Sequence, residues 1–286
     1  MNREIVVGYD GSNHADEALA WAAKAARREH TSLRIVHVAR TFLDGYVVAD
    51  RPLDLTVKIG TQVLANGVER LRVTDPDLVV TTQLEPEDSV AAVLTEASKH
   101  ARLLVVGSRG RGGFAGLLLG SVGVTVASHA HCPVVVVRTQ PASAEQSVRP
   151  VVVGVDGSAT SMSAVDFAFD QASRLGLPLV AVHGWELPSL FGPVPPWMPE
   201  EVEEIRVAEK AVLSESLAGH AERYPDVDVT PVVRRGGPAQ VLLAAAEDAE
   251  MVVVGSRGLG GFRGLLLGSV SQAVLHHATS PVVVVR

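Results

Sequence analysis

The chain contains one unit twice, and this repeat constrains the fold more than any other feature of the sequence. Residues 5–12, IVVGYDGS, return as residues 151–158, VVVGVDGS, at an offset of 146. Near the ends of the two copies, 25 of the 36 residues from 103 to 138 are identical in 251–286, at an offset of 148. Because this period is far longer than the repeat of a solenoid, the sequence predicts a duplicated domain.

Two domains also suit the length of the chain, because its 286 residues are about twice the usual size of one domain. The polar stretch TQPASAEQSVR separates the copies and is typical of a linker. We therefore expect a first domain over residues 1–139, a linker over 140–149 and a second domain over 150–286. Hydrophobic residues make up 47% of the chain, which is enough for a core in each domain.

Each copy alternates short apolar runs with helical patterns. The runs are rich in valine and isoleucine and predict fully buried strands. They cover residues 4–9, 33–38, 78–84, 103–107 and 133–138 in the first copy, and 150–155, 179–183, 227–232, 251–255 and 281–286 in the second. Between them, residues such as Ala15, Leu19, Ala22 and Ala26 recur at helical spacing. Strands that alternate with helices predict an α/β fold, with a doubly wound parallel sheet in each copy.

Charge and composition exclude several classes of protein. Lys and Arg number 25 against 32 Asp and Glu, and the net charge of −7 argues against binding to nucleic acid or to an anionic membrane surface. The single cysteine, Cys132, cannot form an intrachain disulfide. The chain opens directly into a strand pattern without a signal peptide, and no stretch reaches the roughly 20 apolar residues of a membrane span. We therefore expect a cytoplasmic protein.

The candidate site lies in loops that follow strands, because ligands of open parallel sheets bind beyond the carboxyl ends of the strands, where the strand order reverses. After the fourth strand, both copies carry a glycine-rich loop with the spacing G-x2-G-x9-G-S. The residues of interest are Gly107, Ser108, Arg109, Gly110, Arg111, Gly112, Gly113, Gly120, Ser121 and Val122 in the first copy, and Gly255, Ser256, Arg257, Gly258, Leu259, Gly260, Gly261, Gly268, Ser269 and Val270 in the second.

These residue types suit the binding of a phosphate. Glycines let backbone N–H groups approach an anion closely, and a helix N-terminus adds unpaired N–H groups and a favourable dipole. Ser121 and Ser269 can donate hydroxyl hydrogen bonds, and Arg109 and Arg257 can neutralise charge. A tight turn that needs glycine only for its geometry is the alternative. We favour the anion site because the loop is retained in both copies, whereas most of residues 42–102 differ from their counterpart.

With the opening V-G-x-D-G-S, at residues 7–12 and 153–158, this loop resembles the universal stress protein family, in particular tandem members of its ATP-binding branch. The resemblance covers both copies nearly end to end. It implies the strand order 3-2-1-4-5 in a Rossmann-like sheet and one nucleotide site in each half. The further site residues that it implies are Gly8, Asp10, Ser12 and Val38 in the first copy, and Gly154, Asp156, Ser158 and Gly184 in the second.

The resemblance also implies a role for each group of residues. Asp10 and Asp156 would contact the ribose or adenine side of the nucleotide, and Val38 or Gly184 would border the adenine. The glycines and serines of the loops would hold the ribose and the phosphates. Ser12 and Ser158 also stand where the N-cap of a helix is expected.

The two copies differ at several of these positions. The second copy has leucine at 259 for Arg111, valine at 155 for Tyr9 and glycine at 184 for Val38. Either Arg263, which replaces an alanine, compensates for the basic group lost at 259, or the second site binds more weakly.

Other sites are less consistent with the sequence. No Gly-Lys pair and no G-x-S-x-G motif occur, which argues against a P-loop and against an α/β-hydrolase. A loose dinucleotide motif at residues 110–115 follows the fourth strand rather than the first. His129, His131 and Cys132 are not retained together in the second copy, so we expect no metal site. For His37 and His183, each inside a strand, we favour a core histidine over a general base.

The sequence therefore favours a nucleotide sensor of the stress response that binds ATP, with or without Mg²⁺, and hydrolyses little or none of it. No catalytic residue is assigned, because no convincing base is repeated beside the phosphate loop. Two alternatives stay open. One is a Mg²⁺-dependent ATPase or nucleotidyl transferase of low activity that uses Asp10 or Asp156, and the other is an interaction module that binds no nucleotide.

The fifth strands indicate how the two halves associate. Residues 134–137 and 282–285 are all valine, and an unpaired apolar edge strand invites aggregation. Single-domain members of the family dimerise in a similar way, so we expect the two halves to pair through these strands as an internal dimer. A homodimer of the whole chain and an unknown protein partner stay open.

Overall fold

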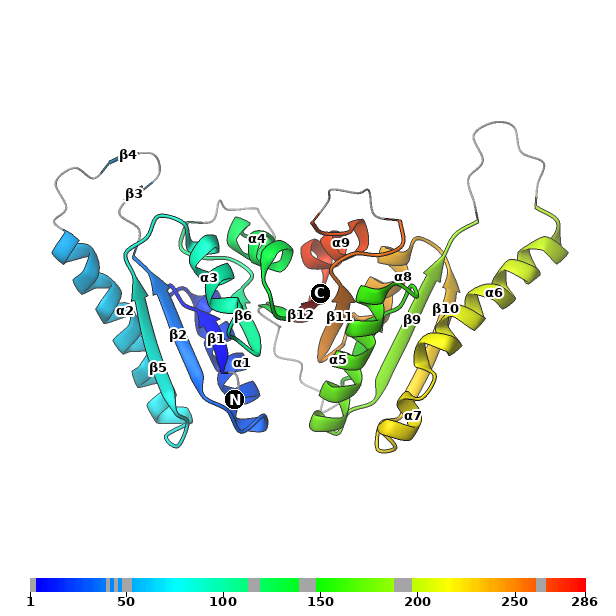
Figure 1. Ribbon diagram of the computed structural model, residues 1–286, viewed down its shortest axis with the longest axis horizontal. Helices are drawn as coiled ribbons and strands as arrows, with labels where there is room; N and C mark the ends of the chain where they lie inside the picture. Colours follow the sequence, from blue (N-terminus) through cyan, green and yellow to red (C-terminus); the bar gives the residue numbers. More distant parts are fainter. Residues whose placement is uncertain are drawn as a thin grey trace. The chain divides into compact units, whose positions relative to one another are not determined.

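The computed structural model describes residues 4–39, 42–43, 46–47, 53–112, 119–138, 148–187, 197–260 and 266–286 (Figure 1). The chain divides into two units, Met1–Pro141 and Ala142–Arg286. Most of the expected linker, from 140 to 147, lies outside the described residues. Each unit is a parallel sheet covered by helices.

The first unit contains a sheet of five parallel strands in the order β5-β2-β1-β6-β7. Helices α1 and α2 pack on one face, and α3 and α4 pack on the other. The elements are β1 (Ile5–Gly8), α1 (Asn13–Arg28), β2 (Leu33–Val38), β3 (Phe42–Leu43), β4 (Tyr46–Val47), α2 (Leu53–Thr74), β5 (Val80–Glu85), α3 (Val90–Ser98), β6 (Leu103–Gly107), α4 (Ser121–His129) and β7 (Val134–Val137). The short strands β3 and β4 form a separate antiparallel pair.

The second unit repeats this arrangement with the strand order β10-β9-β8-β11-β12. Its elements are β8 (Val151–Gly154), α5 (Ala159–Leu175), β9 (Leu179–Trp185), α6 (Pro199–Leu217), α7 (His220–Arg223), β10 (Val229–Arg235), α8 (Pro238–Ala245), β11 (Met251–Gly255), α9 (Ser269–His277) and β12 (Val282–Val285). In chain order within each unit, both sheets have the order 3-2-1-4-5. The predicted α/β class and the implied strand order are therefore confirmed.

The prediction of fully buried strands is confirmed for the central strands and wrong for the third strand of each half. In β1 and β6 every residue except the terminal glycine is buried. In β5, Thr81 and Thr82 are exposed, and in β10, Thr230 and Pro231 are exposed. Each of these strands lies at an edge of its sheet, beside a single neighbouring strand, so less of its surface is covered. Both also begin two residues later than predicted.

The helix after the first strand begins as the sequence predicts in both halves. The Ser12 hydroxyl accepts a hydrogen bond from the N–H of Ala15, and the Ser158 hydroxyl accepts one from Ser161, each at 3.2 Å. The predicted face of α1, made of alanines and a leucine, is buried against the sheet. These caps fix where the chain leaves the carboxyl end of the first strand. None of the helices that the structure describes is long and apolar enough to cross a membrane.

Candidate functional site

The loops after the first and fourth strands meet at the carboxyl end of each sheet. Strand β1 lies between β2 and β6. The chain continues from β1 to β2 on one side and later adds β6 on the other side, so the strand order reverses at β1. Ligands of a doubly wound sheet bind at such a reversal, beyond the carboxyl ends of the strands. Gly8 and Gly107 are the last residues of the two adjacent strands, and Gly154 and Gly255 repeat this in the second half. The predicted loops are therefore neighbours in both halves.

A carboxylate joins the two loops. One oxygen of Asp10 accepts the N–H of Ser12 at 3.0 Å, and the other accepts the N–H of Arg111 at 2.8 Å. In the second half, Asp156 accepts the N–H groups of Ser158 at 3.0 Å and Leu259 at 3.1 Å. Because the donors are main-chain groups, the change from arginine to leucine leaves this link intact. Each carboxylate oxygen keeps further lone-pair capacity for a ligand.

Several of the predicted glycines are required by contacts inside the protein. A Cβ on Gly110 would lie 2.6 Å from an oxygen of Asp10, and a Cβ on Gly258 would collide with Asp156. A Cβ on Gly107 would lie 2.7 Å from the carbonyl oxygen of His14. A Cβ on Gly8 or Gly154 would press on a leucine of the helix above, and one on Gly255 would press on the backbone of α5. Protein packing thus accounts for these glycines.

Two glycines have no such explanation. Among the described residues, a Cβ on Gly112 or on Gly260 would meet no atom within 4 Å, and both glycines are exposed. Neither has a positive φ that would demand glycine for conformational reasons. With respect to the part of the chain that the structure describes, the missing side chains therefore leave open space at both glycines, where an external group can approach the backbone.

The helix that follows each loop presents its N-terminus to the same region. Its N-cap is Gly120 in α4 and Gly268 in α9, both extended, and neither has a side chain that could accept the first N–H groups. The N–H of each N-cap glycine donates to the carbonyl of Ser108 or Ser256 at 2.8 Å, which holds the helix start against the loop. Neither first turn carries an acidic residue, and Ser121 and Ser269 are exposed. Such a terminus favours an anion.

Arginines supply positive charge at this end of each sheet. The Arg109 Nε donates to His14 Nε2 at 3.0 Å, which turns this arginine toward the start of α1. Burial lowers the pKa of Arg138, and the nearby positive charge of Arg109 lowers it further. In the second half, burial and Arg257 lower the pKa of Arg286 in the same way. Paired like charges raise the local positive potential, which attracts an anion.

Arg138 and Arg286 were missing from the predicted site. The available signal was the ending VVVVR of both copies, in which a charged arginine follows four valines. The main chain places them: the N–H of Ser108 donates to the carbonyl of Val137 at 2.8 Å, so that residue 138 lies beside the glycine-rich loop.

The predicted adenine-side positions differ between the halves. Val38 ends β2 and is buried, so its side chain belongs to the core at this point. A Cβ on Gly184 would lie 2.7 Å from the Cα of Pro238, the first residue of α8. Glycine here lets α8 approach β9 closely. This packing explains why the two copies carry different residues, whereas contact with adenine stays a prediction.

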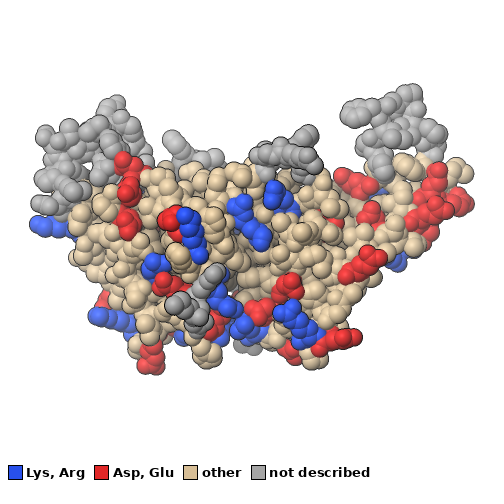
Figure 2. All heavy atoms as spheres, in the orientation of Figure 1, with Lys and Arg blue, Asp and Glu red and all other residues tan. Residues whose placement is uncertain are grey.

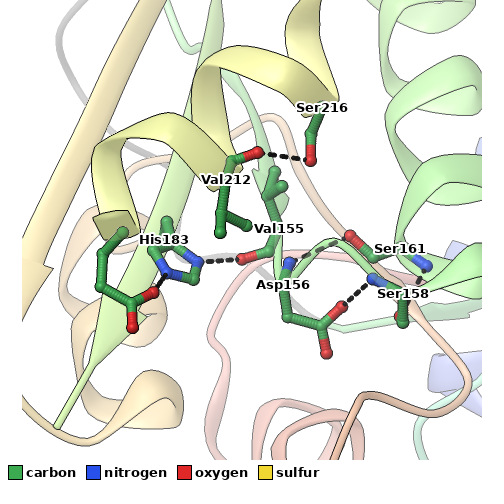
Figure 3. Close-up of polar contacts among 8 residues, drawn as sticks. Val155, Asp156, Ser158, Ser161, His183, Val212 and Ser216 are labelled. Atoms are coloured by element: carbon green, nitrogen blue, oxygen red, sulfur yellow. Dashed lines mark hydrogen bonds and ion pairs between the residues drawn. The ribbon is translucent and has the colours of Figure 1, made fainter. Parts of the chain in front are cut away.

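Both strand histidines are bound to a main-chain carbonyl. The Nδ1 of His37 lies 2.7 Å from the carbonyl oxygen of Tyr9, and that of His183 lies 2.7 Å from the carbonyl oxygen of Val155 (Figure 3). A carbonyl can only accept, so Nδ1 carries a proton in both rings. Each histidine thus ties the second strand to the residue before the site aspartate, which agrees with a structural role; His183 is buried, whereas His37 is partly exposed.

Tyr9 belongs to a polar cluster of the first half. Its hydroxyl donates to Asp16 at 2.7 Å, and the other oxygen of Asp16 lies 3.1 Å from the guanidinium of Arg70. Burial, assisted by Asp16, raises the pKa of Tyr9 to about 12. The phenol therefore stays protonated and ties β1 to α1 and α2.

Some predicted positions lie elsewhere or outside the described residues. Gly113, Gly261 and Arg263 lie outside them, as do most of the loops after the second strands. The Nδ1 of His129 bonds the carbonyl of Thr125 at 2.9 Å. The part of the chain that the structure describes holds no group of three potential metal ligands. A hollow of about 500 Å³, lined by Arg27, His30 and Asp75, lies at the opposite end of the first sheet, away from the loops.

Comparisons with known proteins agree with this architecture. A model of the universal stress protein family matches residues 1–138 and 147–286. A universal stress protein of Mycolicibacterium smegmatis is 41% identical over 292 residues, which cover 99% of this chain and 96% of that protein. One from Mycobacterium tuberculosis is 39% identical over 295 residues, with coverage of 99% and 96%.

Solved structures extend the comparison to the fold. A universal stress protein from Archaeoglobus fulgidus superposes with a TM-score of 0.69 at 20% identity, covering 100% of this chain and 97% of that chain. A protein from Pseudomonas aeruginosa gives a TM-score of 0.65 at 18% identity, with coverage of 99% and 92%. At these identities the two structures establish the fold alone, including its duplication within one chain.

Proposed function

The chain belongs to the universal stress protein family, as its motifs predicted, and on this premise we propose that it is a regulatory protein of the stress response that binds one ATP in each half. Hydrolysis is slow or absent, and the bound nucleotide acts as a signal rather than as a substrate. A cytoplasmic location, predicted from the sequence, is part of this proposal.

The observation that carries the proposal is the convergence of three elements in both halves. A carboxylate at the end of the first strand, a glycine-rich loop and a helix N-terminus without a side-chain cap meet at one edge of the sheet. The exposed glycines at 112 and 260 leave open space beside them. A polyphosphate with a ribose suits this combination of acceptor and donors better than a neutral ligand does.

Each part of the nucleotide has a partner of matching chemistry. The phosphates would accept hydrogen bonds from the first N–H groups and hydroxyls at Ser121 and Ser269, with Arg109 and Arg257 balancing charge. A ribose hydroxyl would donate to Asp10 or Asp156, whose oxygens keep free lone pairs. Mg²⁺ would arrive coordinated by the phosphates themselves, because the described residues offer no cluster of three ligands.

The polar groups near the site already make hydrogen bonds within the protein, and this supports slow hydrolysis of ATP. In the first half, His14 Nε2 accepts a hydrogen bond from Arg109. The Tyr9 hydroxyl is bound to Asp16. A general base must be free to take a proton from the attacking water, and these groups would have to break an existing bond first.

Two measurements test the proposal. Native mass spectrometry of the purified chain identifies any nucleotide that accompanies it, and calorimetric titration of the nucleotide-free chain with ATP gives the stoichiometry. We expect two ATP per chain and no steady release of ADP. Steady ADP release that disappears in the double variant Asp10→Ala, Asp156→Ala would establish an ATPase instead. A chain that binds no nucleotide at all would be an interaction module.

A further inference from the structure

A chain of hydrogen bonds found in the second half connects α6 to the site aspartate (Figure 3). It begins at Glu209 on α6, whose carboxylate oxygen lies 2.6 Å from Nε2 of His183 on β9. The other ring nitrogen, Nδ1, lies 2.7 Å from the carbonyl oxygen of Val155. Val155 is the residue before Asp156, so the chain ends at the peptide bond that carries the site carboxylate.

The two distances fix the number of protons in this chain. Nδ1 must donate, because a carbonyl oxygen has no proton to give. An ionised carboxylate is also only an acceptor, and 2.6 Å is the length of a strong charge-assisted hydrogen bond. A proton therefore lies between Nε2 and Glu209, and with an ionised Glu209 carboxylate His183 donates from both nitrogens. Without that proton, two lone pairs would face each other at this distance.

Burial makes this arrangement specific to one glutamate. Of the six glutamates in α6, five are exposed, and Figure 2 shows acidic side chains gathered over this helix. Glu209 alone is partly covered, with its side chain 30% exposed, and the His183 side chain is only 7% exposed. A buried donor needs an acceptor, so the glutamate compensates for the charge on the ring.

The peptide bond between Val155 and Asp156 is held at both of its polar atoms. Its carbonyl accepts from His183, and its N–H donates to the Ser161 hydroxyl at 3.1 Å (Figure 3). The Asp156 carboxylate, in turn, accepts the N–H groups of Ser158 and Leu259. The orientation of the carboxylate therefore depends on a peptide plane that two side chains fix.

Among the described residues of the first half, no carboxylate stands in the place of Glu209. The glycine after each site aspartate has a left-handed conformation. A Cβ on Gly11 would contact Val63 of α2, and a Cβ on Gly157 would contact Val212 of α6, so the two valines occupy equivalent places. Counting back three residues, Gly60 stands where α6 has Glu209. A Cβ on Gly60 would lie 3.1 Å from the ring of His37, so there is no carboxylate at this point. Ala15 likewise replaces Ser161.

Other charged groups near His183 do not replace Glu209. On β10, Arg234 and Arg235 follow Val233, the residue paired with His183. On α5, Asp166 is bound to His220 and Asp170 to Arg174. On α6, Arg206 is bound to Glu203, and Lys210 is exposed; α8 has no charged residue. Glu209 is thus the carboxylate that contacts the ring.

We propose that Glu209 is a positioning residue of the second nucleotide site: it keeps His183 as a donor on both ring nitrogens, and His183 fixes the peptide that orients Asp156. This inference rests on the proposed function and concerns the second half alone, because Gly60 faces His37 at the corresponding place in the first half.

The direct test is an NMR measurement of histidine ring protonation in the full chain without nucleotide. With ¹⁵N-labelled histidine near pH 7, we expect His183 to carry protons on both nitrogens and His37 on Nδ1 alone. The variants H183Q and H37Q assign the signals. In E209Q the amide can donate to Nε2, so the ring should change to a single proton on Nδ1. A single protonated nitrogen on His183 in the natural chain, or no change in E209Q, would overturn the proposal.

The second arm measures ATP binding at each half through the amide signals of Ser121 and Ser269. In E209A we expect the affinity at Ser269 to fall about three- to tenfold, as for the loss of one hydrogen bond, with no change at Ser121. In E209Q, whose side-chain amide can still hydrogen-bond to Nε2, the affinity should be retained. Equal effects at both serines would contradict the assignment. If ATP binds to neither half, the proposed function is wrong. The NMR measurement is made without nucleotide, so it still tests the contact between Glu209 and His183 independently.

Discussion

Glycines 110 and 112 lie two residues apart in one loop and should respond in opposite ways to the same substitution. In Gly110→Ala, the new Cβ would meet an Asp10 oxygen at 2.6 Å, and that oxygen would have to move by about 0.8 Å to reach ordinary contact at 3.4 Å. A displacement of this size breaks its 2.8 Å hydrogen bond from Arg111. A hydrogen bond to a charged group contributes about 1.5 kcal/mol at this half-exposed site.

The lower entropy of the unfolded alanine chain offsets about 0.5 kcal/mol of this loss. Gly110→Ala should therefore destabilise the first half by about 1 kcal/mol and lower its melting temperature by about 3 °C. Gly112→Ala has no clash and should leave the free energy of unfolding unchanged or raise it by about 0.5 kcal/mol. Its effect should appear only with ligand, as a smaller stabilisation by ATP.

Thermal unfolding followed by circular dichroism, with and without ATP, distinguishes the two variants. If Gly112→Ala destabilises the nucleotide-free chain as much as Gly110→Ala does, the contacts assigned to these glycines are wrong. If Gly112→Ala retains the full ATP-induced shift, the open space beside it is not where the phosphates lie.

Two further predictions follow from the structure, and a third follows from the expectation, made from the sequence, that the fifth strands pair. The stability that the Tyr9 hydroxyl contributes should be complete below pH 10 and be lost as the pH rises from about 10 to about 12; absorbance titration should show one tyrosine ionising late, and Tyr9→Phe should remove both effects. Replacing Arg109 and Arg257 with glutamine should weaken ATP binding more than AMP binding and reduce its salt dependence, and an equal loss for both nucleotides would exclude a contact with the β- and γ-phosphates. Limited proteolysis within residues 140–149 should leave the halves associated on a sizing column, and their separation would refute pairing through the fifth strands.

The repeat in the sequence predicted the duplicated domain and the apolar runs predicted the α/β class, whereas the strand order was implied by the family resemblance. Apolar runs and the caps at Ser12 and Ser158 define where strands end and helices begin, and these signals are local. The same reasoning overestimated the burial of β5 and β10. A valine-rich run does not reveal whether a strand has one neighbour or two, and that depends on the strand order.

The site was predictable as a set of residues but not as a set of contacts. The bond between Asp10 and the main chain at Arg111 spans 101 positions, and no sequence pattern predicts a carboxylate bound to a backbone N–H at that distance. Glu209 was missed for another reason. It lies in the part of the repeat that has diverged most, where the first copy has glycine, so comparison of the copies offered no signal.

The central claim, that each half holds a polyphosphate between its glycine-rich loop and the start of the following helix, is tested most directly by a crystal structure of the chain grown with a non-hydrolysable ATP analogue. The account predicts electron density for one nucleotide in each half, with phosphate oxygens accepting hydrogen bonds from the main-chain N–H groups of Ser121 and Ser269 and a ribose hydroxyl on Asp10 and Asp156. Nucleotide bound elsewhere, with these N–H groups paired to the protein's own side chains, would contradict it.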